Sequence, residues 1–267
     1  MSLALTIAGS DSGGGAGIQA DLKTFFAFGV YGTSVITSLT AQNTCGVSGI
    51  FEVEPSFVLK QIRAVFDDMR VDAVKTGMLY NKKIVGLIAS YFKIAGFKKI
   101  IVDPVMISKS GHRLLKADAV KALKEKLLPI AFLVTPNIFE AEKLTGMKIC
   151  SVEDMKKAGK LIQKSGVRNV LIKGGHLSGN PCDVLVSQKG VKVYEGKRYS
   201  SGCTHGVGCT LSSAITASVA RGFSIFKAVE IAKRYVEEAI KNGYNPGKGC
   251  GPVNHFVKPN FGEKYRR

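Results

Sequence analysis

Short, uninterrupted apolar runs alternate with longer segments of helical periodicity along the first two thirds of the chain. Runs such as residues 3–8 and 131–134 lack the polar alternation of a half-exposed strand, which is typical of strands buried on both faces of a sheet. In the segments between the runs, apolar residues recur every three or four positions and predict helices. This order predicts an α/β fold in which a central, mainly parallel sheet carries helices on both faces. The expected elements are residues 3–8, 17–28, 30–39, 56–69, 73–76, 82–95, 100–102, 116–127, 131–134, 138–144, 152–165 and 170–172.

The pattern changes in the last third of the chain. Two β-rich runs, residues 183–188 and 191–194, predict a hairpin, either on the edge of the sheet or over a site. Two helices are then predicted, over residues 206–221 and 225–241. No linker, repeat or low-complexity tract divides the sequence, so we expect a single domain over residues 1–267.

The composition excludes several classes of protein. With 267 residues, 45% hydrophobic and 22% charged, the chain can bury a sizeable core without disulfides. No apolar stretch approaches the roughly 20 residues of a membrane-spanning helix, and the start, MSLALTIAGSD, lacks the positive region of a signal peptide. The six cysteines form no C-x-x-C pair and therefore predict neither a zinc site nor a disulfide framework. We expect a cytoplasmic protein without a membrane partner.

The chain carries 38 Lys and Arg against 20 Asp and Glu, a net charge of +18. Such an excess raises the possibility of a nucleic-acid partner. The basic residues are nevertheless spread along predicted helices, for example over residues 121–126 and 156–164, without the aromatic set of an RNA-binding module. We therefore expect solvated helix faces and no nucleic-acid partner, with a field that favours small phosphorylated ligands.

A glycine-rich turn, residues 9–17, follows the first strand and opens a helix. Its Gly15-x-Gly17-x-x-Ala20 fits the dinucleotide-binding string, but that fold needs an acidic residue about 20 positions on to hold the ribose. Residues 22–51 contain no Asp or Glu, which disfavours a dehydrogenase, and no Walker A string occurs. The turn predicts a close approach of backbone to a ligand, although a glycine turn that serves only packing stays the alternative.

A second glycine-rich element, residues 204–210, precedes a helix of small residues. Free N–H groups at a helix N-terminus bind anions. Cys209 in the first turn is a candidate base or nucleophile, because the helix dipole favours its thiolate. The helix terminus lowers the thiol pKa and a bound phosphate raises it, so the net direction stays open. A small buried cysteine is the alternative. A Cys-His-Asn hydrolase is disfavoured, because His205 lies only four residues before Cys209.

Charged residues follow three predicted strands. Asp103 comes after one strand, Glu140 lies just after the next in a helix opened by Pro136 and Asn137, and Lys173 ends a third. Two carboxylates at neighbouring strand ends can hold Mg²⁺ for a nucleotide, and a lysine there can contact phosphate. The alternative is that these residues only cap helices and turns.

Together these elements resemble the hydroxymethylpyrimidine/phosphomethylpyrimidine kinases of thiamin biosynthesis. The resemblance spans nearly the whole chain in order. It implies a ribokinase-like, three-layer fold, commonly a homodimer, that uses ATP and Mg²⁺ to phosphorylate 4-amino-5-hydroxymethyl-2-methylpyrimidine and then its monophosphate. The matching segments are Gly9-Ser-Asp-Ser-Gly-Gly-Gly-Ala-Gly-Ile-Gln-Ala-Asp21, Ser38-Leu-Thr-Ala-Gln-Asn-Thr44, Lys75-Thr-Gly-Met78, Asp103-Pro-Val-Met106, Thr135-Pro-Asn137 with Glu140, Lys173-Gly-Gly-His176 and His205-Gly-Val-Gly-Cys-Thr-Leu-Ser-Ser213.

The resemblance also implies roles for individual residues. The pyrimidine is expected against Gly9, Ala16, Asp21, Gln42, Met78 and Val105. ATP is expected near Asn137, Lys173 and Thr204, and Mg²⁺ near Asp103 and Glu140. The loop Gly206, Val207, Gly208 and Cys209 is expected to form the anion hole, with Cys209 as the base.

The chain departs from the family pattern at two places. Cys203 and Val207 stand where the family has Asn and Thr, which removes or alters side-chain contacts to phosphate but leaves the backbone donors. Ser110-Gly-His-Arg113 stands where the family has Ser-Gly-Asp-Arg.

Two other functions stay open. A pyridoxine or pyridoxal kinase of the same fold phosphorylates a similar hydroxymethyl heterocycle. A binding protein without catalysis would be expected to lose the base, and Cys209 is present.

Overall fold

The computed structural model describes residues 1–107, 111, 114–177, 179–199 and 202–262. The departure expected at Ser110, His112 and Arg113 lies outside the described residues. Most predicted elements appear within a few residues of their expected bounds.

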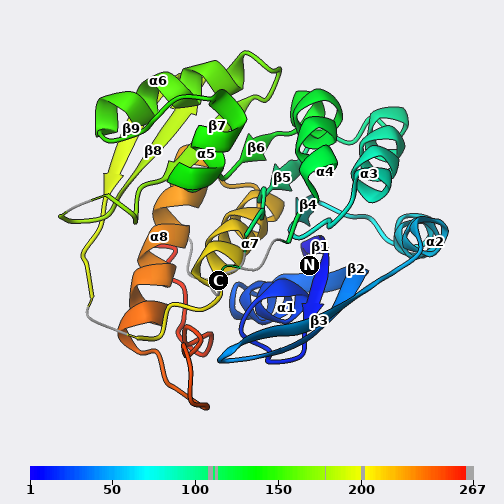
Figure 1. Ribbon diagram of the computed structural model, residues 1–267, viewed down its shortest axis with the longest axis horizontal. Coiled ribbons are helices and arrows are strands. Elements are labelled where there is room, and N and C mark those ends of the chain that lie inside the picture. Colours follow the sequence, from blue (N-terminus) through cyan, green and yellow to red (C-terminus); the bar gives the residue numbers. More distant parts are fainter. Residues whose placement is uncertain (108–110, 112–113, 178, 200–201, 263–267) are drawn as a thin grey trace.

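One sheet of nine strands, in the order β3-β2-β1-β4-β5-β6-β7-β8-β9, runs through the molecule (Figure 1). The six strands from β2 to β7 are parallel, whereas β3, β8 and β9 extend the two ends as antiparallel strands. The hairpin β8-β9 therefore lies on the edge of the sheet, which decides between the two expected placements. The strands are β1 (Leu3–Asp11), β2 (Tyr31–Asn43), β3 (Gly46–Glu52), β4 (Ala73–Thr76), β5 (Ile100–Val102), β6 (Leu133–Val134), β7 (Asn169–Lys173), β8 (Cys182–Ser187) and β9 (Gly190–Glu195).

Helices cover both faces of the sheet, which confirms the predicted three layers. Buried side chains of α2 to α6 form one core with the sheet, and those of α1, α7 and α8 form the other. The helices are α1 (Gly17–Ala27), α2 (Pro55–Phe66), α3 (Lys82–Ile94), α4 (Ala117–Ala122), α5 (Ile138–Thr145), α6 (Val152–Gln163), α7 (Val207–Ala220) and α8 (Ile225–Lys241).

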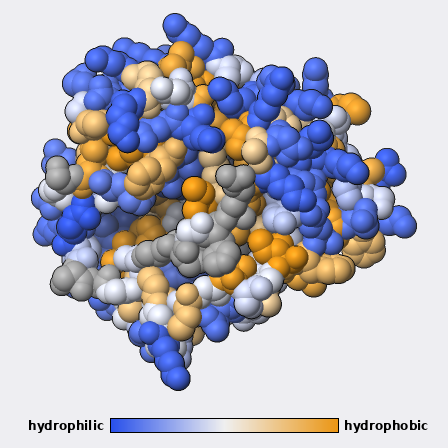
Figure 2. Space-filling view, viewed as in Figure 1, coloured by the Kyte–Doolittle hydropathy of each residue, from blue (hydrophilic) through white to orange (hydrophobic). Residues whose placement is uncertain are grey.

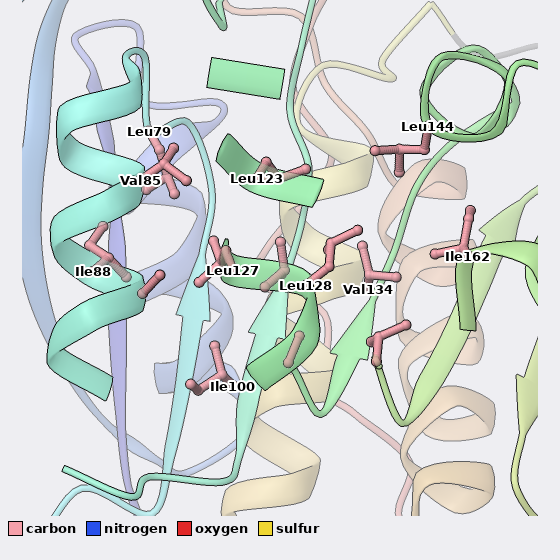
Figure 3. Packing of buried hydrophobic residues seen from close by; sticks show 14 of the residues in the cluster. Leu79, Val85, Ile88, Ile100, Leu123, Leu127, Leu128, Val134, Leu144 and Ile162 are labelled. Atoms are coloured by element: carbon pink, nitrogen blue, oxygen red, sulfur yellow. The ribbon is translucent and has the colours of Figure 1, made fainter. Parts of the chain in front are cut away.

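Successive residues of a strand supply the two cores in turn, because side chains alternate across a sheet. In β5, Ile100 and Val102 join the first core and Ile101 joins the second. Figure 3 shows how side chains of α3 and of the segment after α4, among them Ile88 and Leu127, pack toward the strands of the first core. Both faces of the central strands are buried, which explains their continuous apolar runs.

Two elements differ from the prediction. Strand β3 was not expected, because Gly46 and Gly49 interrupt its apolar residues and it lies on the sheet edge. The helix expected over residues 116–127 divides into α4 and a π-helical turn, Leu123–Leu127, followed by a 3-10 turn, Leu128–Ile130, that contains Pro129. A proline lacks the N–H that a continuing α-helix would need.

The expected solvated lysine faces are present. Lys121, Lys124 and Lys126 of the segment after α3, and Lys157 and Lys160 of α6, are exposed. In Figure 2, hydrophilic residues surround the outer parts of the visible face and apolar residues gather nearer its middle. Among the described residues, no helix is both long and apolar enough to cross a membrane.

Candidate active site

The carboxyl ends of the parallel strands meet at one edge of the sheet, where α/β folds bind ligands. Asp11 ends β1, Gln42 lies near the end of β2, and Asp103 follows β5. Lys173 ends β7. The topology therefore brings the predicted residues of distant segments to one edge.

Asp103 is buried and accepts three side-chain hydrogen bonds. Lys173 Nζ donates to its Oδ1 at 2.9 Å and Thr135 Oγ1 to the same oxygen at 3.1 Å. Ser212 Oγ of α7 donates to Oδ2 at 3.2 Å. Burial works to raise the pKa of Asp103, but the charges of Lys173 and Lys75 outweigh it and hold the pKa below its usual value. Asp103 therefore lies ionised beneath the edge.

Glu140 forms a capping box with Asn137 at the start of α5. The Asn137 side chain accepts from Glu140 N at 2.9 Å, and Glu140 Oε2 accepts from Asn137 N at 2.8 Å. Asn137 and Glu140 thus cap a helix, which was the alternative to a ligand-binding role in the sequence analysis. Burial, with the charge of Asp103, raises the pKa of Glu140 to about 7, although Lys173 opposes this. Glu140 is therefore a carboxyl whose charge changes near neutral pH.

The N-terminus of α7 lies beside this charged group. Gly206 caps the helix with a φ of 78°, a left-handed conformation that favours glycine. A Cβ placed on Gly208 would lie 3.3 Å from Lys173 Nζ and 3.8 Å from Asp103 Oδ2. Free backbone donors, an ammonium and a carboxylate therefore converge where an anion would bind.

Cys209 is half-buried in the first turn of α7. The sequence left the direction of its thiol pKa open. Burial raises the pKa to about 11, with Asp21 and Asp103 acting in the same direction, against the charge of Lys75. Desolvation of the thiolate and the two carboxylates thus outweigh the charge of Lys75 and the hydrogen bond with the Gly17 backbone.

The glycine loop between β1 and α1 is folded around the Asp11 carboxylate. Asp11 accepts from the N–H groups of Gly13, Gly15 and Ala16 at 2.8, 3.1 and 2.8 Å. A Cβ on Gly206 would lie 1.8 Å from the Gly15 carbonyl oxygen. The two glycine-rich loops thus touch through their backbones, and glycine is required there.

The expected pyrimidine contacts occupy the other half of the edge. A Cβ on Gly9 would lie 2.8 Å from Ser38 Oγ and 3.2 Å from Met78 Sδ. Gln42 is half-buried, with its amide nitrogen 3.2 Å from His205 Nε2. Val105 and Ala16 are also partly exposed. These positions leave a mixed polar and apolar wall between the two glycine loops.

Asp21 is placed differently from the expectation. Its side chain has no exposed surface and accepts from Thr6 Oγ1 at 2.6 Å, Ser213 Oγ at 2.6 Å and Lys75 Nζ at 2.7 Å. Lys75 is equally buried. A carboxylate enclosed in this way cannot contact a ligand directly, so Asp21 lies beneath the site as a support for it.

Val207 and Cys203, the two departures from the family pattern near α7, are both at least partly withdrawn from solvent. Val207 packs against the core shared by α1, α7 and α8. Cys203 is buried, and its Sγ would lie 2.9 Å from a Cβ on Gly251. Thr204 is half-buried, with its Oγ1 3.7 Å from Cys250 Sγ.

Four polar residues of the site were not assigned a role from the sequence. Asp11 and His205 bond to each other at 3.0 Å, Lys75 holds Asp21, and Ser212 supports Asp103. Asp11 carried a signal, because an aspartate followed by glycines favours side-chain capping of its own loop. The buried lysine carried none, because nothing in an apolar strand reveals its partner.

The family model for phosphomethylpyrimidine kinase matches residues 11–254. The chain is 48% identical to the hydroxymethylpyrimidine/phosphomethylpyrimidine kinase of Bacillus subtilis, over 95% of this chain and 94% of that protein. It is 50% identical to the thiamine biosynthesis bifunctional protein of Geobacter sulfurreducens, over 95% of this chain but only 52% of that longer protein.

A pyridoxal kinase of Bacillus subtilis, solved as an ADP complex, superposes with a TM-score of 0.89 at 39% identity and covers 96% of this chain and 97% of its own. The shared architecture confirms the ribokinase-like fold. With the match over nearly the whole chain and the phosphate-binding geometry at the strand ends, the chain belongs to the phosphomethylpyrimidine kinase family of phosphotransferases.

Proposed function

We propose that this protein transfers the γ-phosphoryl group of ATP to the hydroxymethyl oxygen of 4-amino-5-hydroxymethyl-2-methylpyrimidine, and then phosphorylates the monophosphate to the diphosphate, as a step of thiamin biosynthesis. The observation that carries the proposal is the convergence of the α7 N-terminus, Lys173 and Cys209 at one end of the site. Phosphoryl transfer chiefly requires positioning and charge neutralisation, and these groups supply both.

In this reaction the hydroxymethyl oxygen bonds to the γ-phosphorus, the bond from that phosphorus to the bridging oxygen of ADP breaks, and ADP leaves. Cys209 accepts the hydroxyl proton. The backbone N–H groups of Gly206 to Cys209 donate to the phosphoryl oxygens, where negative charge concentrates. Lys173 contacts the phosphates. Burial acts to lower its pKa, but Asp103 and Glu140 raise it, so the ammonium stays charged.

Five residues line the proposed pyrimidine site: Gly9, Ala16, Gln42, Met78 and Val105. Gln42 bonds the aminopyrimidine edge, and the thioether of Met78 packs on the ring. Asp21 acts indirectly, through Lys75 and Ser213. Asn137 and Thr204 lie on the nucleotide side.

Asp103 lies close enough to Glu140 for its charge to raise the pKa of Glu140, and neighbouring carboxylates are ligands that Mg²⁺ prefers. Among the described residues no group of three or more His, Cys, Asp or Glu side chains could hold a metal. Asp103 and Glu140 would hold the ion together with waters and nucleotide phosphates, which is how Mg²⁺ is usually bound in kinases. The bound ion would neutralise the negative charge of the phosphates.

We expect the Mg²⁺ requirement to depend on pH. Because the pKa of Glu140 is about 7, its carboxylate becomes protonated as the pH falls from 8 to 6, and the Mg²⁺ concentration at half-maximal rate should rise. Asp103→Asn and Glu140→Gln should raise that concentration while leaving pyrimidine affinity near normal, and Glu140→Gln should remove the pH dependence. Glu142→Gln, on the same helix but paired with Lys148, is the control. Unchanged Mg²⁺ titrations in both site variants would exclude the metal role.

The substrate is tested by a coupled ATPase assay with the pyrimidine, its monophosphate and pyridoxal side by side. We expect both pyrimidines to be phosphorylated, with products identified by mass. The pyridoxal kinase fold match keeps pyridoxal as the second candidate. A kcat/KM for pyridoxal far above that for either pyrimidine would replace the proposed substrate.

We also expect a homodimer built on the β2-β3 end of the sheet. Leu39 and Phe51 are cross-strand neighbours there, and 46% and 69% of their surfaces are exposed. Such an apolar edge favours burial against a second copy. Light scattering should give twice the mass of the chain, and Phe51→Lys should shift it toward the monomer. A wild-type monomer at micromolar concentration would contradict this assembly.

A further inference from the structure

Four side chains from three segments meet beside the proposed pyrimidine site. His205 Nε2 lies 3.0 Å from Asp11 Oδ2 and 3.2 Å from the amide nitrogen of Gln42. Thr40 Oγ1 lies 3.3 Å from the amide oxygen of Gln42 and 2.9 Å from the Ser10 carbonyl oxygen. The number of hydrogens on each group decides which group donates and which accepts at each of these contacts.

The proton on His205 is fixed by Asp11. Burial works to raise the pKa of Asp11, but hydrogen bonds from His205, Ala16 and Gly13 outweigh it and lower the pKa. The carboxylate can therefore only accept, so Nε2 must carry a hydrogen in either the neutral or the charged ring. An Nε2–H group cannot also accept a hydrogen bond from the Gln42 amide nitrogen.

Thr40 has the matching conflict. Its hydroxyl has a single hydrogen, which the Ser10 carbonyl accepts at the shorter distance. That hydroxyl cannot donate to the Gln42 amide oxygen as well, although its lone pairs can accept a hydrogen bond.

Turning the amide by 180° resolves both conflicts at once. The amide oxygen then shares the single Nε2–H hydrogen of His205 with Asp11 Oδ2 in a three-centre bond, and the amide NH₂ donates to Thr40 Oγ1. Without this turn, the amide NH₂ faces the Nε2–H donor of His205, and the amide oxygen faces the oxygen of Thr40 with no hydrogen between them. Thr40 is buried, so no free solvent relieves the mismatch there.

We infer that His205 and Thr40 are positioning residues that fix the direction of the Gln42 amide and thereby make the site select a 4-aminopyrimidine edge over a 4-oxopyrimidine edge. This inference rests on the proposed function. The amino ring presents a donor beside a ring-nitrogen acceptor, whereas the oxo ring presents an acceptor beside an N–H donor. An amide that can turn would pair with either ring edge. A fixed amide pairs only with the edge whose donor and acceptor are complementary to its oxygen and its NH₂ group.

The experiment compares kcat/KM for 4-amino-5-hydroxymethyl-2-methylpyrimidine and its 4-oxo counterpart. The wild type should strongly prefer the amino ring. Thr40→Val and His205→Leu should each reduce that preference by about 10- to 100-fold, because each frees one end of the amide. His205→Gln, which keeps a side-chain N–H donor, should restore much of it. Ser48→Ala, on the neighbouring strand, where the hydroxyl donates to the Ala41 carbonyl, should leave it unchanged.

An unchanged preference in both Thr40→Val and His205→Leu would overturn the inference while leaving the proposed function intact. If neither ring is phosphorylated by the wild type, the proposed function fails instead. A nitrogen-15 NMR correlation of the His205 ring then decides the amide clamp without any substrate: a proton on Nε2 supports it, and an unprotonated Nε2 overturns it.

Discussion

Replacing Cys209 by serine is expected to lower kcat by roughly 10²- to 10⁴-fold with the fold intact, because a hydroxyl of similar volume is a far poorer base. Cys209→Asp should retain substantial activity, since a carboxylate at this helix terminus can accept the same proton beside Lys75. Turnover and thermal midpoint are measured for the serine, alanine and aspartate variants. Cys150→Ser, at an exposed cysteine, is the control.

The pH profile adds an independent test of the same role. With the pKa of Cys209 at about 11 in the free protein, the active thiolate is a minor species near neutral pH. The kcat/KM should therefore rise with pH, by about tenfold per unit well below that pKa. Cys209→Asp should lose this rise. Near-wild-type turnover in Cys209→Ala would instead assign the cysteine a structural role, with the proton leaving to phosphate or solvent.

The second large effect is expected in stability. Lys75→Met removes one partner of a fully buried ion pair and should lower the free energy of unfolding by about 3–5 kcal/mol, because Asp21 is left charged without its counter-ion. Urea denaturation measures the loss. Lys116→Met, at an exposed pair with Glu52, should cost less than about 1 kcal/mol.

A double variant separates the effect of the unpaired charge from the effect of the lost lysine packing. Lys75→Met with Asp21→Asn removes both charges. The asparagine oxygen can still accept from Ser213, which donates to Oδ1 of Asp21, whereas the hydroxyl of Thr6, which donates to Oδ2, must accept from the amide nitrogen instead. It should recover much of the stability lost in the single variant. No recovery would mean that packing of the lysine chain, and not charge balance, is what the core requires.

The alternation of apolar runs and helical segments predicted the fold well. Continuous runs such as Ile100–Val102 are strands because both faces of the sheet are covered. Strand β3 escaped prediction because its residues alternate irregularly with glycine and pair only at an edge. The π-helical turn after α4 also escaped, since its register depends on packing against α3 that local sequence does not encode.

The sequence predicted several residues of the site but not the contacts between them. Asp103 and Lys173 could be placed together because parallel strands end at one edge, and the family resemblance added the α7 loop. That Asp21 is enclosed by Lys75, and that His205 reaches both Asp11 and Gln42, depends on contacts between residues far apart in the sequence. The pKa of Cys209 could not be predicted because it depends on burial and on the charges of Lys75, Asp21 and Asp103, which come from distant parts of the sequence.

Helix α7 is buried along its length from Thr210 to Ala220, and α8 packs over it. The donors at its N-terminus, Gly206 to Cys209, are half-buried, but they are attached to one of the least accessible helices of the polypeptide. Such a helix does not fray or open on its own; its amide hydrogens exchange with solvent only when the surrounding layers separate. Heating should consequently abolish turnover and native structure in a single cooperative transition, without an inactive but still folded form at intermediate temperatures.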